Sequence, residues 1–127
     1  LASIIEKESS LNTEKNVISS VFHQRINLGM RLQSDPTVIY GMGRRYEGNL
    51  TRKNLSEVNA YNTYRIDGLP PTPISLAGKS SIEASLNPSD STFLYFVSRG
   101  DGTHYFSETL SEHNNAVNLY QRKSGSN

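Results

Sequence analysis

Apolar residues at helical spacing in the N-terminal part of the chain constrain the fold more than any other pattern. Leu1, Ile4 and Ile5 share one face of a helix over residues 1–10. A second helix follows, and its expected buried residues again share one face: Val17, Ile18, Val21, Phe22 and Ile26. Gly29 can end this helix, because glycine readily adopts the left-handed conformation found at helix C-termini. Two helices joined by a short turn should therefore pack together early in the chain.

The middle of the chain predicts shorter elements. Pro36 suits the first position of a third helix, and Asp35 or Ser34 can cap it. The polar stretch after this helix predicts a loop with a short helix at 52–58. Residues 61–66 alternate in polarity and are rich in strand formers, so they predict a strand. A stiff, proline-rich loop is expected after that strand.

The last third of the chain carries the clearest strand pattern. Phe93–Val97 is an apolar run of strand formers, Asp101-Gly102 signals a hairpin turn, and His104–Phe106 supplies the return strand. A short helix that Ser80 or Ser81 can cap is expected before this hairpin at 81–86. A final helix that Ser111 can cap is expected after it at 111–122.

Helices and strands mostly segregate along the chain, which predicts an α+β fold. N-terminal helices should pack with a small antiparallel sheet and a C-terminal helix. The length of 127 residues suits one domain. We expect that domain to cover residues 1–123 and residues 124–127 to form a flexible tail.

Composition excludes several function classes. The chain has 13 basic and 12 acidic residues and a net charge of +1, so no strong field attracts nucleic acid or anionic lipid. It has no cysteine, which excludes disulfides, thiolate zinc sites and a cysteine nucleophile. We predict neither a metal nor a cofactor, and we expect His104 and His113 to form hydrogen bonds near the sheet. No apolar run approaches the ~20 residues that span a bilayer.

Glu6 is the carboxylate with the most unusual setting. Its neighbours three and four positions away on a helix are all small: Ala2, Ser3, Ser9 and Ser10. Small neighbours leave room for a large molecule to approach the carboxylate. Partial burial would raise the pKa of Glu6 and keep it protonated near neutrality, as a general acid requires. Taken alone, this pattern still favours an ordinary surface glutamate.

The other carboxylates have ordinary contexts. A set of glutamates is predicted to be solvated or to cap helices: Glu8, Glu14, Glu57, Glu83, Glu108 and Glu112. Asp35 directly precedes a proline, so we expect a helix cap there rather than a catalyst.

Polar and aromatic side chains gather on two stiff segments, one at the start of the third helix and one on the expected strand. The members are Gln33, Asp35, Thr37, Tyr40, Tyr61, Asn62, Thr63 and Tyr64. Tyrosine faces and amide groups suit sugar rings, which offer C–H groups on their faces and hydroxyls at their edges. The alternative is that side chains such as Asn62 and Gln33 satisfy loop backbone groups, and composition does not decide between the two.

Several long motifs resemble a known family. They occur in order over roughly Leu1 to Tyr120, and the main ones are Leu1–Glu8, Gly29–Gly41, Tyr61–Tyr64, Gly68–Pro71 and Tyr95–Val97. In these segments the chain closely resembles the endolytic murein transglycosylase family, also called YceG-like. Ser9 and Ser34 stand where threonine is common in that family, and both changes are conservative.

The resemblance implies an enzyme, a lyase that cuts within the glycan strands of peptidoglycan. It implies an extracytoplasmic location on the inner membrane, with a single membrane anchor and a LysM-like subdomain outside this catalytic domain. Cell-wall synthases are implied partners, and nucleic acid is not. The family's catalytic glutamate falls on Glu6, and the polar residues of the two stiff segments become candidate substrate-binding residues.

The mechanism that the resemblance implies needs one carboxylate. Glu6 would protonate the glycosidic oxygen between MurNAc and GlcNAc and then take the proton of the muramic acid 6-hydroxyl, which attacks its own anomeric carbon and leaves a 1,6-anhydro end. One alternative is a hydrolytic muramidase that uses Glu6 and Asp35 as its two carboxyl groups. Another is a non-catalytic glycan-binding module of the cell-wall synthesis machinery.

Overall fold

Six α-helices, one 3-10 helix and a two-stranded hairpin make up the computed structural model, which describes residues 1–125. The α+β class predicted from the sequence is confirmed. Along the chain the elements are α1 (Ala2–Glu8), α2 (Asn12–Asn27), α3 (Asp35–Met42), η1 (Gly43–Arg45), α4 (Arg52–Ser56), α5 (Lys79–Leu86), β1 (Tyr95–Ser98), β2 (His104–Ser107) and α6 (Leu110–Gly125).

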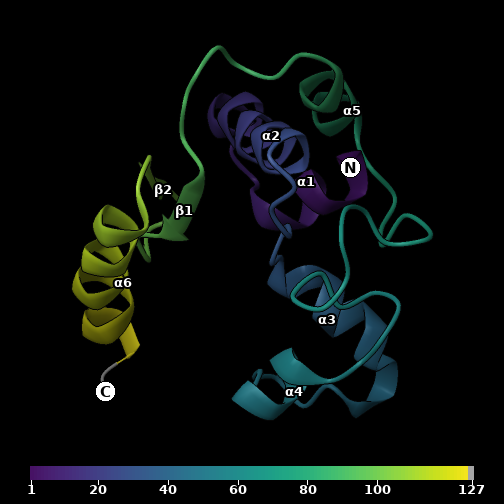
Figure 1. The fold of residues 1–127 in the computed structure, drawn as a ribbon. Coiled ribbons are helices and arrows are strands. Elements are labelled where there is room, and N and C mark those ends of the chain that lie inside the picture. Colours follow the sequence, from purple (N-terminus) through teal and green to yellow (C-terminus); the bar gives the residue numbers. More distant parts are fainter. Residues whose placement is uncertain (126–127) are drawn as a thin grey trace.

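α1, α2 and α5 pack together as a helical body (Figure 1). The hydrophobic core of this body lies between α1, α2 and the loops before α3 and α5. The buried cluster at its centre consists of Ile4, Ile5, Ile18, Phe22, Leu32 and Ile74. The helical faces predicted for the first two helices are therefore confirmed in their main members. Burying each large aliphatic or aromatic side chain contributes roughly 1.5–3 kcal/mol, so this cluster fixes α1 firmly against α2.

The prediction that Ile26 is buried on the inner face of α2 is wrong. Ile26 is 39% exposed, whereas the neighbouring Arg25 is buried. Arg25 Nε donates to the Leu94 carbonyl at 2.7 Å, and Nη1 donates to the Arg31 carbonyl at 2.7 Å. These bonds tie the last turn of α2 to the segments before β1 and α3. This turn therefore presents a guanidinium to the interior, and the isoleucine beside it faces outward.

The predicted hairpin is confirmed. β1 and β2 pair antiparallel, with Tyr95 opposite Ser107 and Ser98 opposite His104. The turn contains Gly100 at φ +89° and Gly102 at φ +93°, a backbone conformation that glycine adopts without steric cost. α6 packs on the hairpin, and together they form a unit beside the helical body (Figure 1).

The start and end of α6 differ slightly from the prediction. The cap is Thr109, not Ser111, because the Glu112 backbone N–H donates to Thr109 Oγ1 at 3.2 Å. Glu112 Oε1 in turn accepts from the Thr109 N–H, which completes a capping box. The helix runs to Gly125 rather than to about 122, and residues 126–127 of the predicted tail lie outside the described residues. The domain boundary at 123 stays a prediction.

The strand predicted at 61–66 is wrong, because this segment forms consecutive turns. Asn62 is the physical reason. Its Oδ1 accepts from the Tyr64 N–H at 2.9 Å, and its Nδ2 donates to the carbonyls of Leu55 and Glu57. A side chain that bonds nearby backbone groups in this way replaces the partner strand that an extended segment would need.

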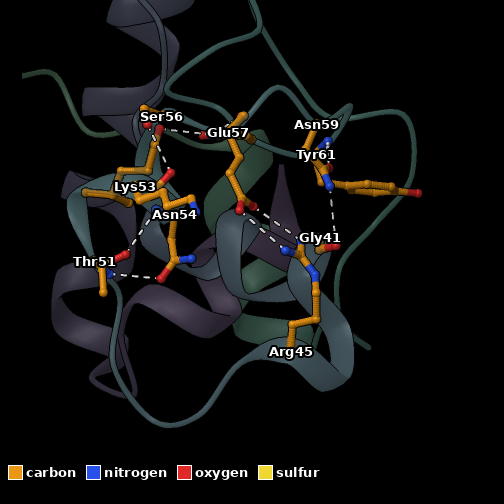
Figure 2. Close-up of polar contacts among 11 residues, drawn as sticks. Gly41, Arg45, Thr51, Lys53, Asn54, Ser56, Glu57, Asn59 and Tyr61 are labelled. Atoms are coloured by element: carbon orange, nitrogen blue, oxygen red, sulfur yellow. Dashed lines mark hydrogen bonds and ion pairs between the residues drawn. The ribbon is translucent and has the colours of Figure 1, made fainter.

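α3 and α4 form a lobe below the helical body, held by the polar contacts in Figure 2. Thr51 and Asn54 cap α4 reciprocally, and the short helix predicted in this region is confirmed. Asn59 Nδ2 donates to the Gly41 carbonyl at 3.4 Å. A Cβ at Gly41 would lie 2.7 Å from Asn59 Oδ1, so a larger residue here would have to displace the Asn59 side chain. The lobe fixes the far end of α3, whose N-terminal end carries Asp35.

Candidate active site

A cavity of about 480 Å³ lies between α1, α2, the start of α3 and the hairpin with α6, and we call it the central cavity. Its polar lining consists of Glu8, Arg25, Gln33, Asp35, Tyr64, Ser98, His104, His113 and Gln121. These residues come from both ends of the sequence. A concave site with several convergent polar and titratable groups is the usual setting for binding or catalysis.

Glu8 is the titratable group of this cavity with the most informative surroundings. Burial raises the pKa of the Glu8 carboxyl to about 7, the negative charge of Asp35 adds to this rise, and a hydrogen bond from Ser34 opposes it. Ser34 Oγ donates to Glu8 Oε2 at 2.7 Å and fixes the carboxyl group in the cavity wall. Glu8 is therefore partly protonated near neutrality and can both donate and accept a proton.

Asp35 and Tyr64 form a fixed pair in the same cavity. The Tyr64 hydroxyl donates to Asp35 Oδ1 at 2.6 Å. Burial raises the pKa of this hydroxyl far above its usual range, and the bond to Asp35 raises it further. Tyr64 therefore remains a neutral donor, and it holds the Asp35 carboxylate in one orientation within the cavity.

Gln33 lines the cavity in a strained backbone conformation. Its φ of +52° is the only positive value at a non-glycine residue in the described part of the chain. The Gln33 N–H donates to the Thr63 carbonyl at 3.3 Å, and Arg25 Nη1 lies 3.5 Å from Gln33 Oε1. Such a conformation costs about 1–3 kcal/mol and persists where the surroundings impose it, often at functional sites.

A second hollow of about 660 Å³, which we call the outer cavity, adjoins the central cavity. Glu8, Ser98 and His104 line both cavities, so the two meet at these side chains. The rest of the outer cavity lining comes from α1 and the turn after it, from the loop before α5 and from Gly102 of the hairpin turn. Glu6, Lys7 and Ser75 are among these lining residues. A long polymer that passed Glu8 could therefore place one neighbouring unit in the central cavity and the next in the outer cavity.

Comparison with known proteins places the chain in a family. Residues 1–119 match the model of the YceG-like family. This chain belongs to that family.

Two curated relatives of this YceG-like chain are each named endolytic murein transglycosylase. The protein from Bacillus subtilis (strain 168) is 42% identical over 120 residues, which cover 94% of this chain and 33% of the relative. The protein from Streptococcus pneumoniae serotype 2 (strain D39) is 31% identical over 122 residues, which cover 92% of this chain and 22% of the relative. This chain thus spans a third or less of the length of these relatives.

A solved structure agrees with the family membership. The crystal structure of a yceG-like protein from Listeria monocytogenes matches with a TM-score of 0.84 and 49% identity. The match covers 90% of this chain and 37% of the other chain. The fold described above is therefore the fold of a YceG-like protein.

Glu6, to which the family resemblance assigned the catalytic role, has surroundings opposite to those expected. Its Oε1 accepts from the Gly78 N–H at 2.9 Å and from Ser81 Oγ at 2.8 Å, and Lys15 Nζ lies 3.9 Å away. The Gly78 N–H lowers the pKa of Glu6 below its ordinary value, and the Ser81 bond lowers it further. The expectation of a raised pKa is therefore wrong. The serine cap expected for α5 is wrong as well, because Gly78 is the N-cap and Glu6 satisfies its N–H.

The predicted substrate-binding residues divide into two groups. Gln33, Asp35 and Tyr64 line the central cavity with Glu8. The others lie outside both cavities: Thr37, Tyr40, Tyr61, Asn62 and Thr63.

Residues of the second group make contacts that hold the loops. Thr37 and Thr63 are fully buried, with their hydroxyl oxygens 2.9 Å apart, and Thr63 Oγ1 accepts from the Ser34 N–H at 2.8 Å. Tyr40 and Tyr61 pack against each other with ring centroids 5.0 Å apart. These contacts position the start of α3, and a role of these side chains in substrate binding stays a prediction.

Glu8 and Glu14 were wrongly predicted to be solvated. Glu8 follows Ile4 by four positions and Ile5 by three, so the helical pattern puts it on the buried face of α1. That spacing is the signal that could have identified it. No comparable signal exists for Glu14, because its partner His104 lies 90 positions away.

The two histidines predicted near the sheet behave differently. The His104 prediction is confirmed, because its Nδ1 lies 2.7 Å from Glu14 Oε1. His113 Nδ1 is buried without a hydrogen-bond partner among the described residues, so that part of the prediction is wrong. The His113 ring instead stacks on Tyr95 at 5.0 Å. Burial lowers the pKa of His113, and the Arg25 charge lowers it further, which favours the neutral imidazole.

Within residues 1–125 no three histidine or carboxylate side chains gather closely enough to hold a metal ion. In the same range, no helix has the length and apolarity required to cross a membrane.

Proposed function

We propose that this domain cleaves the MurNAc-β-1,4-GlcNAc bond within peptidoglycan glycan strands by lytic transglycosylation, with Glu8 as the general acid. The name shared by its relatives supports an enzyme that acts on murein. The observation that carries the assignment of Glu8 is a carboxyl group with a pKa of about 7 at the junction of two cavities. Glu6 remains the rival assignment from the sequence, but its lowered pKa suits a permanently charged helix cap.

In the proposed reaction the protonated Glu8 donates its proton to the glycosidic oxygen as the bond from the muramic anomeric carbon breaks. The GlcNAc hydroxyl leaves, and positive charge develops on the muramic ring. The 6-hydroxyl of the same muramic acid then attacks the anomeric carbon and loses its proton to a base in the cavity. This attack is intramolecular, so effective molarities on the order of 10⁵ M or more replace an external nucleophile.

The other groups of the central cavity suit the remaining demands of this chemistry. The Asp35 carboxylate, held by Tyr64, supplies negative charge beside the developing positive charge of the sugar. Its charge also contributes to the raised pKa of Glu8. Gln33 offers an amide for sugar hydroxyls.

The proposed substrate implies where the protein works. Peptidoglycan lies outside the cytoplasm, so we expect this domain at the extracytoplasmic face of the inner membrane. Attachment by an anchor outside this chain, and contact with cell-wall synthases, belong to the same proposal.

Mass spectrometry of peptidoglycan digested by the protein tests the proposal. The expected products are glycan fragments that end in 1,6-anhydroMurNAc, from cuts within long strands. Reducing MurNAc ends would instead support a hydrolytic muramidase, for which Asp35 in the same cavity is the available second carboxyl. Binding of glycan strands without any cleavage would support a non-catalytic module and would overturn the proposal.

A further inference from the structure

His104 is held by Glu14 through two contacts. Glu14 Oε2 accepts from the His104 backbone N–H at 2.9 Å, and Glu14 Oε1 lies 2.7 Å from His104 Nδ1. The side chains are only 10% and 16% exposed, respectively for His104 and Glu14. The carboxylate is an acceptor in both contacts, so His104 Nδ1 carries a proton. In the neutral ring, Nε2 is then the unprotonated nitrogen.

His104 also lies at the junction of the two cavities. It lines both of them together with Glu8. Phe96 packs edge-on against the imidazole at 5.4 Å, so the ring is fixed on a second side. Nε2 has no hydrogen-bond partner among the described residues. A carboxylate-oriented imidazole with one available nitrogen is a common arrangement for a general base.

We propose that His104, oriented by Glu14, is the base that removes the proton of the muramic 6-hydroxyl, while Glu8 acts as the acid. This inference rests on the proposed function and extends it. Glu8 gives its proton to the departing GlcNAc oxygen, the 6-oxygen bonds to the anomeric carbon, and the 6-hydroxyl proton moves to His104 Nε2. Glu14 Oε1, 2.7 Å from Nδ1, keeps the ring in one orientation during this transfer. Transfer of that proton to the Glu8 carboxylate, directly or through water, restores both groups without any outside reactant.

A mechanism with Glu8 as acid and His104 as base predicts a different pH profile of kcat from a mechanism with Glu8 alone. The titratable and charged groups around His104 are Glu14 in contact and Glu8 in both cavities. The others line the central cavity (Arg25, Asp35, Tyr64 and His113) or the outer cavity (Glu6 and Lys7). With Glu8 alone, kcat should stay level at low pH and fall above pH about 7. With His104 as base, kcat should also fall at low pH, because the protonated ring cannot accept.

The experiment compares His104→Gln with wild type and with His23→Gln, a histidine outside both cavities, by measuring anhydro-end formation across pH. We expect His104→Gln to lower kcat by about 10²-fold or more, since general bases contribute on that scale, and to abolish the fall at low pH. His23→Gln should retain both the rate and the profile. An unchanged acid limb in a folded His104→Gln protein would overturn the proposal.

Chemical rescue separates catalysis from structural support. His104→Ala leaves a gap at the cavity junction, and added imidazole should restore part of the activity. A series of substituted imidazoles should rescue more strongly as their basicity increases. Absence of rescue, with substrate binding intact, would assign His104 a structural role. Failure of the proposed function itself is distinguishable, because wild type would then yield no anhydro ends at all.

Discussion

Glu6 and Glu8 lie two positions apart on α1 and meet opposite surroundings. Glu6 faces the N-terminus of α5, where a backbone N–H and a serine hydroxyl lower its pKa. Glu8 faces the central cavity, where burial raises its pKa to about 7. The same side chain on the same helix thus serves as a helix cap on one side and is suited to proton transfer on the other. The side of α1 from which each glutamate projects therefore determines its surroundings and its role.

The largest expected effect is the difference in cleavage rate between Glu8→Gln and Glu6→Gln, in which an amide replaces each carboxyl group. We expect Glu8→Gln to lower the rate of glycan cleavage by about 10²–10⁴-fold, the usual contribution of a general acid. Glu6→Gln should retain most of the activity, because its carboxylate bonds the backbone and Ser81 rather than the substrate. Release of soluble fragments from purified peptidoglycan measures both rates. An inactive, folded Glu6→Gln with an active Glu8→Gln would reverse the assignment.

The pH dependence of stability should separate the two residues next. Burial raises the pKa of Glu8 from 4.5 to about 7, so between these values the folded protein holds a proton that the unfolded chain releases. The free energy of unfolding should therefore fall as pH rises through this range, by up to roughly 3 kcal/mol. Glu8→Gln removes this loss and should be more stable than wild type above pH about 8. Denaturant unfolding at several pH values measures the difference.

Glu6 should show the opposite sign. Its pKa is lowered in the folded state, so its contribution to stability is present above the ordinary pKa and is lost as pH falls through the folded pKa. Glu6→Gln should be less stable than wild type at neutral pH and should approach it in acid. The same pH dependence of the free energy of unfolding in Glu6→Gln and Glu8→Gln would contradict this contrast between the two residues.

Removal of the hydroxyl that contacts Glu8 should shift the activity profile. The Ser34 hydrogen bond lowers the pKa of Glu8, so Ser34→Ala should raise that pKa further. The fall in kcat on the alkaline side should then move to higher pH by on the order of one unit, since a hydrogen bond to a charged group contributes about 1.5–3 kcal/mol before relaxation. Ser56→Ala on α4 is the control. A shift to lower pH would contradict the role given to Ser34.

The smallest expected effect concerns the other carboxylate. Ser81 is fully buried and donates to Glu6. Ser81→Ala should lower stability by about 0.5–1.5 kcal/mol and leave the pH profile of activity unchanged. Ser85→Ala removes a hydroxyl that bonds only the Ile82 carbonyl of the same helix, and it should have little effect on thermal unfolding. A changed pH profile in Ser81→Ala would connect Glu6 to the chemistry after all.

The sequence predicted the parts of this fold that depend on local pattern. The helices around Ile4 and Phe22 and the hairpin beside Asp101-Gly102 follow from periodicity and turn residues, and they are confirmed. The segment 61–66 has strand-like composition, but Asn62 satisfies the local backbone and forms turns instead. Propensity could not reveal which carbonyls a single amide would reach.

The candidate site was harder to predict, because its surroundings come from distant segments. The position of Glu8 on the buried face of α1 follows from Ile4 and Ile5, four and three positions before it. The Gly78 N–H that lowers the pKa of Glu6 lies 72 positions away. Small neighbours along α1 suggested open space around Glu6, and the N-terminus of α5 occupies part of it.

The hairpin determines when, during synthesis, the central cavity can be completed. His104 reaches Glu14 across 90 positions of sequence, and the central cavity also needs His113 from α6 to close its wall. During synthesis, α1 and α2 emerge before the hairpin and α6, so Glu8 at first lacks the wall that those elements supply. Long-range closure of this kind is slow relative to local helix formation. If the proposed function holds, a nascent or C-terminally truncated chain should therefore be inert toward glycan until nearly all of the domain has been made.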